Sequence, residues 1–248
     1  TKAGGSIAIL GGCGPMGLGA VSYALAIENK PAKVIVTDID DAKLARANEV
    51  ISVEKAKEKG VELIYVNTAK MDDPVDGLKA LSVDGKGFDD VFIFAPNEEM
   101  VTYGVKMLAF DGCLNFFSGP ADQEFSSRVN FYNIHYNSTH FVGTSGGNTE
   151  DMKQSIELIE NKTVNVAKIA THILGLDHAV ETTKVLPELE GSKKIVYTHK
   201  KFPLTEVDKF DENSDDKYIR ELKSIVERNG NLWSGEAERY FIQNAPEI

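Results

Sequence analysis

The feature that most constrains this chain is a glycine-rich turn near its beginning, the segment 12–17 with the sequence GCGPMG. An apolar run at residues 7–10 leads into this turn, and a helical pattern that opens with a proline follows it. A G-x-G-x-x-G turn between a strand and a helix is the fingerprint of a dinucleotide-binding βαβ unit, because glycines allow a tight turn and a close approach of the pyrophosphate. We therefore expect a pyrophosphate at Gly12, Cys13, Gly14, Pro15, Met16 and Gly17.

An acidic residue, Asp38, closes the second predicted strand, at about the 20-residue distance from the glycines that the fingerprint shows. A carboxylate in that place can bond both ribose hydroxyls of an adenosine, and it repels a 2′-phosphate. Asp38 and the glycine turn together predict a dinucleotide cofactor, with NAD(H) preferred over NADP(H). The alternative is that the glycines serve only to pack the helix against the strand.

The first 145 residues alternate between short apolar runs and helical patterns. Predicted strands cover 7–10, 33–38, 62–66, 90–94, 113–117 and 140–143, and predicted helices cover 15–29, 40–59, 74–81 and 98–109. Short strands alternating with helices indicate βαβ units and a parallel sheet. With right-handed crossovers, this pattern predicts an α/β fold, a Rossmann doubly wound parallel sheet of about six strands, with ligands at the carboxyl ends of the strands.

The pattern changes near residue 149. Two further strands, 169–174 and 194–199, alternate with helices at 149–160 and 178–186, and an acidic polar stretch at 205–216 precedes helices at 215–228 and 234–241. We therefore predict a C-terminal α/β return segment and a helical tail after the Rossmann sheet. The predicted divisions are 1–146 for the dinucleotide-binding domain, 147–200 for the return segment and 201–248 for the acidic linker and helical tail.

The charge balance excludes several classes of partner. Lys and Arg total 27 against 38 for Asp and Glu, which gives a formal net charge of −11. Nucleic acid and anionic membrane surfaces attract a basic face, so neither is the expected partner. No apolar run approaches the ~18 residues of a membrane span, and residues 1–6 lack the features of a signal peptide. We expect a cytoplasmic protein.

Two other classes with similar folds can be weighed against a dehydrogenase. Methyltransferases also carry a Gly-rich first turn and a later acid, but an acidic residue usually precedes their glycines, where this chain has Ile9-Leu10-Gly11. Short-chain dehydrogenases need Tyr-x-x-x-Lys on a helix after the fifth strand, and the only such spacing here, Tyr197 to Lys201, falls at a late strand end. We interpret that spacing as a coincidence and keep a methyltransferase as a further hypothesis.

The chain offers no spacing typical of a metal site. Its two cysteines, Cys13 and Cys113, lie far apart in the sequence and can form neither a disulfide framework nor a cysteine cluster for zinc. The five histidines form no H-x-x-x-H motif and no pair with a cysteine at metal spacing. No Ser/His/Asp constellation is recognisable either. We therefore predict no metal ligand and no catalytic residue within this chain.

Several longer stretches belong with the glycine turn and extend over nearly the whole chain. They are VTDIDDAKLARA (36–47), DDVFIFAPN (89–97), DGCLNFFSGP (111–120), NFYNIHYNSTHFVGTSGGNTEDM (130–152), THILGL (171–176), GSKKIVYTH (191–199) and LWSGEAERY (232–240). Together they resemble the zinc-dependent medium-chain alcohol and polyol dehydrogenase family. They are most similar to its L-sorbose-1-phosphate reductase branch.

The resemblance adds residues to the expected coenzyme site, namely Ile39, Lys43, Ala95, Pro96, Ser118 and Lys194. Lys43 matches a family lysine that contacts the adenosine ribose, and the alternative is a solvated lysine on its helix. Lys194 stands where many relatives place a basic residue near the pyrophosphate, and a structural lysine is as plausible there. The remaining four lie at the ends of predicted strands.

The resemblance also implies a larger enzyme. Members of the family begin with a GroES-like domain that holds a catalytic zinc, whereas this chain starts on its first Rossmann strand, so that roughly 150 residues are expected to be missing. The intact enzyme is expected to be a homo-oligomer that transfers hydride between NAD(P)H and a sugar or polyol phosphate, of the L-sorbose 1-phosphate to sorbitol 6-phosphate type. The fragment alone is expected to bind coenzyme but no zinc. The alternative is a stand-alone NAD(H)-binding or redox-sensing module.

Overall fold

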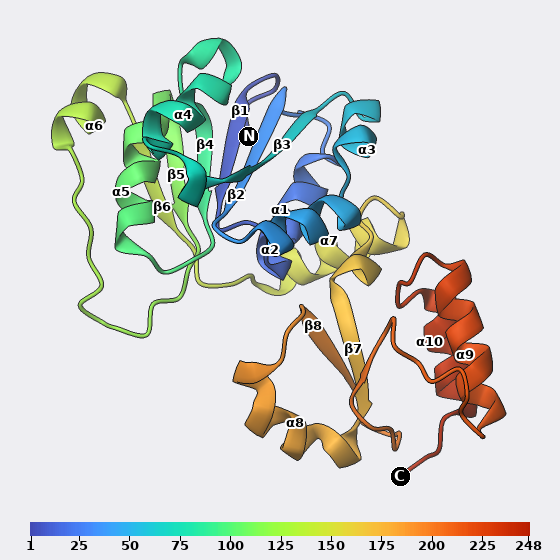
Figure 1. Ribbon diagram of the computed structural model, residues 1–248. Coiled ribbons are helices and arrows are strands. Elements are labelled where there is room, and N and C mark those ends of the chain that lie inside the picture. Colours follow the sequence, from blue (N-terminus) through green and yellow to red (C-terminus); the bar gives the residue numbers. More distant parts are fainter. The chain divides into compact units, whose positions relative to one another are not determined.

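The structure, a computed structural model, describes residues 1–248 and divides into two compact units, Thr1–Val164 and Asn165–Ile248. The first unit contains a six-stranded sheet and the second a three-stranded sheet, each with its own helices (Figure 1). The boundary between the units differs from the predicted limits at residues 146 and 200. Residues 147–164 belong to the first unit, and the predicted linker and tail share one unit with 165–200.

The sheet of the first unit has the strand order β3-β2-β1-β4-β5-β6, and all neighbouring strands are parallel. The strands are β1 (Ser6–Leu10), β2 (Lys33–Asp38), β3 (Glu62–Asn67), β4 (Phe88–Ile93), β5 (Leu108–Phe116) and β6 (His140–Gly143). The helices are α1 (Pro15–Ala24), α2 (Asp41–Val50), α3 (Val53–Glu58), α4 (Pro74–Leu81), α5 (Glu98–Met107), α6 (Phe131–Asn137) and α7 (Thr149–Glu160). This order confirms the predicted doubly wound Rossmann sheet.

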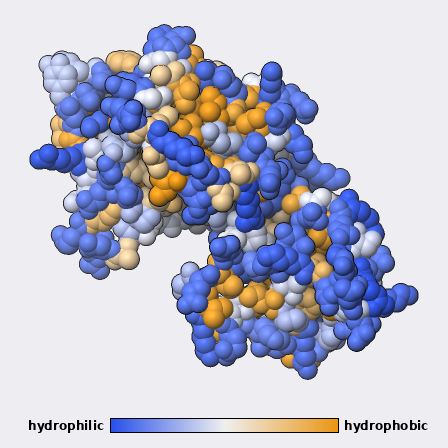
Figure 2. All heavy atoms as spheres, viewed as in Figure 1, coloured by the Kyte–Doolittle hydropathy of each residue, from blue (hydrophilic) through white to orange (hydrophobic).

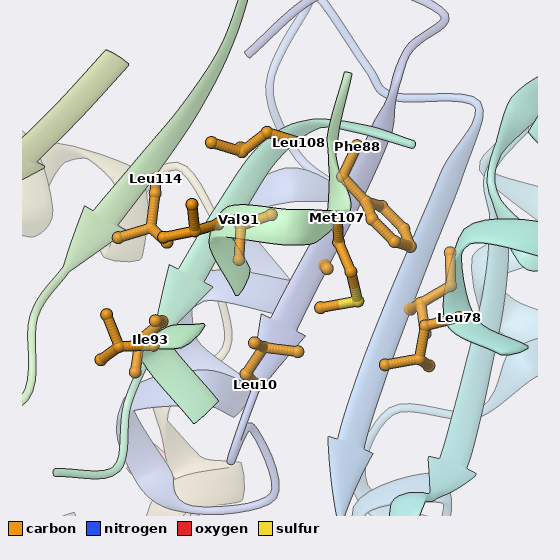
Figure 3. Packing of buried hydrophobic residues seen from close by; sticks show 12 residues of the cluster. Leu10, Leu78, Phe88, Val91, Ile93, Met107, Leu108 and Leu114 are labelled. Carbon is orange, nitrogen blue, oxygen red and sulfur yellow. The ribbon is translucent and has the colours of Figure 1, made fainter. Parts of the chain in front are cut away.

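One face of this sheet is covered by α4 and α5 through a cluster of buried apolar side chains (Figure 3). Leu78 of α4 and Val105 of α5 pack with Leu10 and Ile93 of the sheet, and all four are at most 5% exposed. The opposite face is also buried, since Ile9, which alternates with Leu10 along β1, is only 1% exposed. Burial of both faces is typical of a parallel sheet.

The observed helices differ from the predicted ones in several places. The helix predicted at 15–29 ends at Ala24, and the helix predicted at 98–109 ends at Met107, where β5 begins. The single helix predicted at 40–59 is divided into α2 and α3, because the Ser52 side chain accepts a hydrogen bond from the Lys55 backbone N–H (3.3 Å) and caps a new helix. The short helix α6 was not predicted. It begins where the Asn130 side chain accepts a hydrogen bond from the Tyr132 backbone N–H (2.9 Å).

The second unit is a small mixed sheet with the order β8-β7-β9, in which β7 is parallel to β8 and antiparallel to β9. Its elements are β7 (Ala170–Gly175), α8 (Ala179–Val185), β8 (Lys193–Tyr197), β9 (Thr205–Glu206), α9 (Lys217–Arg228) and α10 (Gly235–Asn244). The core is aromatic: the Trp233 indole N–H donates to the Tyr197 hydroxyl (2.7 Å), which donates to the Glu238 carboxylate (2.6 Å). The acidic stretch predicted as a linker at 205–216 begins with β9, a strand of this sheet.

Hydrophilic residues cover most of the face seen in Figure 2, with hydrophobic patches on both units. This distribution is ordinary, because apolar atoms contribute much of any folded protein's surface. None of the helices combines the length and the apolarity that crossing a lipid bilayer demands.

Candidate coenzyme site

The glycine turn is fixed by close backbone packing. The Gly12 N–H donates to the Thr37 carbonyl oxygen (2.9 Å), and a Cβ atom on Gly12 would lie 2.6 Å from Cγ2 of Ile9. A Cβ atom on Gly17 would lie only 2.2 Å from the Gly12 carbonyl oxygen. Both distances are below van der Waals contact, so these two positions require glycine, as the fingerprint predicts.

The N-terminus of α1 faces open space. Its N-cap is Gly14, no side chain caps the helix, and Pro15 occupies the first turn. A Cβ atom added to Gly14 would meet no atom within 4 Å. Backbone N–H groups at a helix N-terminus lack intrahelical partners and carry a partial positive charge. The turn therefore fits a pyrophosphate, with room at Gly14 for it to approach the backbone.

Asp38 stands at the carboxyl end of β2 in a defined orientation. Its Oδ1 atom accepts hydrogen bonds from the backbone N–H groups of Ile39 (2.9 Å) and Asp40 (3.3 Å). The Ile39 side chain is 71% exposed, and Lys43 is also exposed, in the first turn of α2. The Asp40 side chain caps α2 by accepting hydrogen bonds from its first amides, including that of Lys43 (3.3 Å).

The Cys13 side chain is buried between the glycines, with 9% of its surface exposed. Burial, followed by the negative charge of the nearby Asp38, raises the pKa of the Cys13 thiol to about 12. The thiol is therefore protonated at neutral pH and is a poor nucleophile. This environment suits a small side chain that fills the turn, as the sequence suggests.

The ends of β4 and β5 lie beside the glycine turn. A Cβ atom on Gly11, which has a φ of +66°, would lie 3.0 Å from the Ala95 Cβ, so Ala95 borders the turn directly. The Ser118 hydroxyl is buried and donates to the Ile93 carbonyl oxygen (3.1 Å), which ties the two strand ends together. Pro96, next to Ala95, is exposed.

The fold thus brings most of the predicted site residues to one edge of the sheet. The glycine turn, Asp38, Ala95 and Ser118 follow β1, β2, β4 and β5, whose carboxyl ends meet where the strand order reverses between β1 and β4. Ligands of doubly wound sheets bind in the crevice at this switch point. Lys194 belongs to the second unit, where its Nζ atom donates to the carbonyl oxygens of Glu190 (2.9 Å) and Ser192 (3.0 Å). A role for Lys194 at the pyrophosphate stays a prediction.

Two residues near this site were missed in the sequence. Asn67, at the end of β3, lies opposite Asp38 in the sheet register, and Lys70 follows three residues later. Both bind the carboxylate of Asp41, at the start of α2. The sequence feature that could have identified them is the polar residue at the end of the third strand. Neighbouring parallel strands end at the same edge of a sheet, so this residue could be expected beside Asp38.

The chain holds no group of three or more His, Cys, Asp or Glu side chains that could bind a metal ion. His140 contacts Asp111 (2.9 Å) in an exposed pair, and His172 is buried in the second unit. The residues present therefore do not fit a zinc ion, which needs about three or four converging protein ligands.

A parallel sheet with this strand order, a glycine turn at an open helix N-terminus and an acid ending the second strand define a dinucleotide-binding Rossmann domain. The sequence profile of the family described as "Zinc-binding dehydrogenase" matches residues 15–161, and the chain belongs to that family. The family expected from the sequence is thereby confirmed.

Curated relatives match almost the whole chain. It is 46% identical over 244 residues to the L-sorbose 1-phosphate reductase of Klebsiella pneumoniae and 44% identical over 243 residues to the mannitol-1-phosphate 5-dehydrogenase of Aliivibrio fischeri. Each match covers 98% of this chain but only 56% and 57% of the respective relative. The chain therefore spans little more than half the length of these relatives.

Solved structures share the fold. The 2R,3R-butanediol dehydrogenase of Bacillus subtilis superposes with a TM-score of 0.64 at 19% sequence identity, over 80% of this chain and 52% of that one. At this identity the likeness concerns the fold alone.

Proposed function

We propose that this chain is the coenzyme-binding part of a zinc-dependent oxidoreductase that transfers a hydride between NAD(P)H and a sugar or polyol phosphate. The observation that carries this proposal is the identity of 46% and 44%, across 98% of the chain, to a reductase and a dehydrogenase whose names both specify a phosphorylated six-carbon sugar or polyol. The reaction would be of the type that interconverts L-sorbose 1-phosphate and sorbitol 6-phosphate.

The residues of this chain would bind and orient the coenzyme. The α1 N-terminus at Gly14 offers unpaired amides to the pyrophosphate, and Asp38 offers carboxylate oxygens to the adenosine ribose. Ala95 and Pro96 would border the nicotinamide ribose, and Ser118 would hold the adjoining strand end in place. The nicotinamide, when bound, supplies or accepts the hydride, and the protein determines its position relative to the substrate.

NAD(H) is the proposed coenzyme in preference to NADP(H). The carboxylate of Asp38, oriented by two backbone amides, would face a 2′-phosphate at close range. Like charges a few Å apart repel by about 1–4 kcal/mol, depending on the local dielectric. Residues 39–41 supply no arginine that would compensate for this repulsion.

We propose that the zinc and the substrate are held by a part of the complete enzyme outside this sequence. The structure offers surfaces on which such a part could pack. On α7, Met152, Ile156 and Ile159 are 62%, 54% and 41% exposed and follow helical spacing. In the second unit, Val180 and Val196 are 65% and 41% exposed. The segment 147–200 is therefore proposed to complete the catalytic domain, with 201–248 as its tail.

The complete enzyme is proposed to be a cytoplasmic homo-oligomer. Strand β6 lies at the edge of the six-stranded sheet, and all four of its residues are exposed. An exposed sheet edge can pair with a second copy of the chain. The oligomeric state can be measured by light scattering of the complete enzyme.

The test is an assay of the complete enzyme with L-sorbose 1-phosphate, sorbitol 6-phosphate and unphosphorylated sorbitol, each with NAD(H) and NADP(H). We expect turnover of the phosphorylated compounds with NAD(H), and metal content of about one catalytic zinc per chain. Equal turnover of free sorbitol would contradict the phosphate specificity. Tight NADH binding without turnover of any polyol would instead support the stand-alone NAD(H)-binding or redox-sensing module.

The 248-residue chain provides the matched control. It is expected to bind NADH, measured by calorimetry, but to contain no zinc and to oxidise no polyol. The affinity for NADH distinguishes the coenzyme-binding part of a dehydrogenase from a methyltransferase, which would bind S-adenosylmethionine instead.

A further inference from the structure

Three side chains form a hydrogen-bonded cluster next to Asp38. The Asn67 side-chain amide donates to Oδ1 of Asp41 (2.7 Å), and the Lys70 ammonium donates to Oδ2 of the same carboxylate (2.7 Å). Both oxygens of Asp41 are therefore engaged. We call Asp41, Asn67 and Lys70 the Asp41 cluster.

The Asp41 cluster lies where the adenosine ribose is proposed to bind. In the register of β2 and β3, Asn67 is the direct neighbour of Asp38. Asp41 begins α2, immediately after the turn at residues 38–40. The Asn67 side chain also accepts a hydrogen bond from the Ala69 backbone N–H (3.0 Å), which orients it at the end of β3. Its contact with Asp41 therefore joins the segments that follow two adjacent strands, β2 and β3.

The charges at this edge determine what the ribose pocket can accept. Its carboxylates belong to Asp38, Asp40 and Asp41, and its two cations are Lys43 and Lys70. The Lys70 ammonium and the Asn67 amide lower the pKa of Asp41, because both stabilise its ionised carboxylate. An NADP(H) 2′-phosphate is normally bound by a nearby cation, but the positive charge of Lys70 is already balanced by Asp41.

We propose that Asp41 is a specificity-determining residue: it holds Lys70 in an ion pair and thereby withholds that cation from a 2′-phosphate. The inference rests on the proposed binding of the adenosine ribose at Asp38. It adds a second reason, besides Asp38, why the site would bind NADP(H) more weakly than NAD(H). Asp38 repels the phosphate directly, whereas Asp41 neutralises a cation that would otherwise attract it.

The test is the Asp41→Asn variant, in which the new amide oxygen still accepts the hydrogen bond from Asn67 but no longer pairs with the charge of Lys70. Kd values for NADH and NADPH are measured by calorimetry. We expect NADPH to bind about fivefold more tightly, while the NADH affinity changes by less than about twofold. The double variant Asp41→Asn/Lys70→Gln should lose this gain, because the released cation is then absent.

A matched control is Glu49→Gln, which makes the same charge change on the same helix, at an exposed side chain away from the turn. It is expected to leave the ratio of the two Kd values unchanged. An equal gain in NADPH affinity in Glu49→Gln would show a general charge effect and overturn the proposal, as would a gain that survives in the double variant.

The result for the unmodified protein separates the two proposals. If it binds NADH more tightly than NADPH and Asp41→Asn leaves the ratio unchanged, the role of Asp41 is refuted while the proposed coenzyme site stands. If the unmodified protein binds neither coenzyme, the proposed function itself fails.

Discussion

Both units of this protein have a buried apolar core, and each carries one further packing feature of its own. At the glycine turn of the first unit, backbone atoms pack so closely that Gly12 and Gly17 leave no room for a side chain. In the second unit, large side chains fill the core, and the buried ammonium of Lys200 donates to the Ala245 carbonyl oxygen (3.0 Å) near the C-terminus. We infer that the glycine turn of the first unit allows backbone atoms to come close to a ligand, whereas the helices of the second unit serve to complete its core.

The largest expected effect tests the core of the second unit. Phe241 is fully buried, with ring centroids of Tyr197, Phe202 and Trp233 at 4.8, 5.0 and 5.7 Å. Phe241→Ala should reduce the unfolding free energy of this unit by about 3–5 kcal/mol, because it leaves a cavity. Urea unfolding can be followed by the fluorescence of Trp233, the single tryptophan of the chain.

In native buffer, the NADH affinity of the Phe241→Ala variant should stay within about twofold of the unmodified protein, because Phe241 and the proposed coenzyme site belong to separate compact units with no shared partners. The control Phe110→Ala removes a ring that is 70% exposed and should have little effect. Loss of NADH binding in a folded Phe241→Ala variant would show that the two units are coupled, and the comparison would fail.

The second prediction tests the backbone packing of the turn. Gly17→Ala places a methyl group against the Gly12 carbonyl, so the unfolding free energy of the first unit should fall by about 1–3 kcal/mol. Far-UV circular dichroism during urea unfolding measures the change, while the Trp233 signal should be unaltered.

Gly19→Ala is the matched control on the same helix, since a Cβ atom at Gly19 meets nothing within 4 Å. It should be neutral or stabilising by up to about 1 kcal/mol, as expected for Gly replaced by Ala in a helix. Similar destabilisation by the two variants would mean that close packing is not what requires glycine at position 17.

The third prediction separates binding from stability within the turn. Gly14 has an ordinary φ of −78° and open space around it, so Gly14→Ala should still fold, with a loss of stability of at most about 1 kcal/mol because alanine is a poorer N-cap than glycine. Its methyl group would occupy the space into which the pyrophosphate is proposed to fit, and NADH affinity should fall about tenfold, or about 1.4 kcal/mol. Calorimetric titration measures the affinity. Unchanged NADH binding would remove Gly14 from the site.

These variants also show which features the sequence could predict. The glycine turn and Asp38 depend on local spacing between a strand and a helix, and the structure has both in the predicted context. The doubly wound parallel sheet of about six strands followed from the alternation of strands and helices, together with general rules for crossovers. These features are visible in a single stretch of sequence.

Other features depend on contacts between distant residues and were not predicted. Strand β9, at Thr205–Glu206, is too short and polar for a strand pattern and exists because it pairs with β7. The contacts of Asp41 with Asn67 and Lys70 depend on the register of β2 and β3. A polar residue at a strand end becomes informative only when its neighbour across the sheet is known.

The smallest expected effect concerns the pH dependence of the second unit. His172 is 5% exposed, and burial, followed by the charge of Lys194, lowers its pKa from the usual 6.5. In the unfolded chain the imidazole regains that usual value, so between the two pKa values only the unfolded state binds the proton. The contribution of the neutral His172 to the stability of the folded unit is therefore complete above pH 6.5 and declines as the pH falls below it.

Urea midpoints from Trp233 fluorescence should fall between roughly pH 7.5 and pH 5.5. The fall should be smaller in His172→Gln than in the unmodified protein. The control is His199→Gln, which replaces an exposed histidine of the same unit and should behave like the unmodified protein. A decline just as steep in His172→Gln would assign the acid sensitivity to other groups.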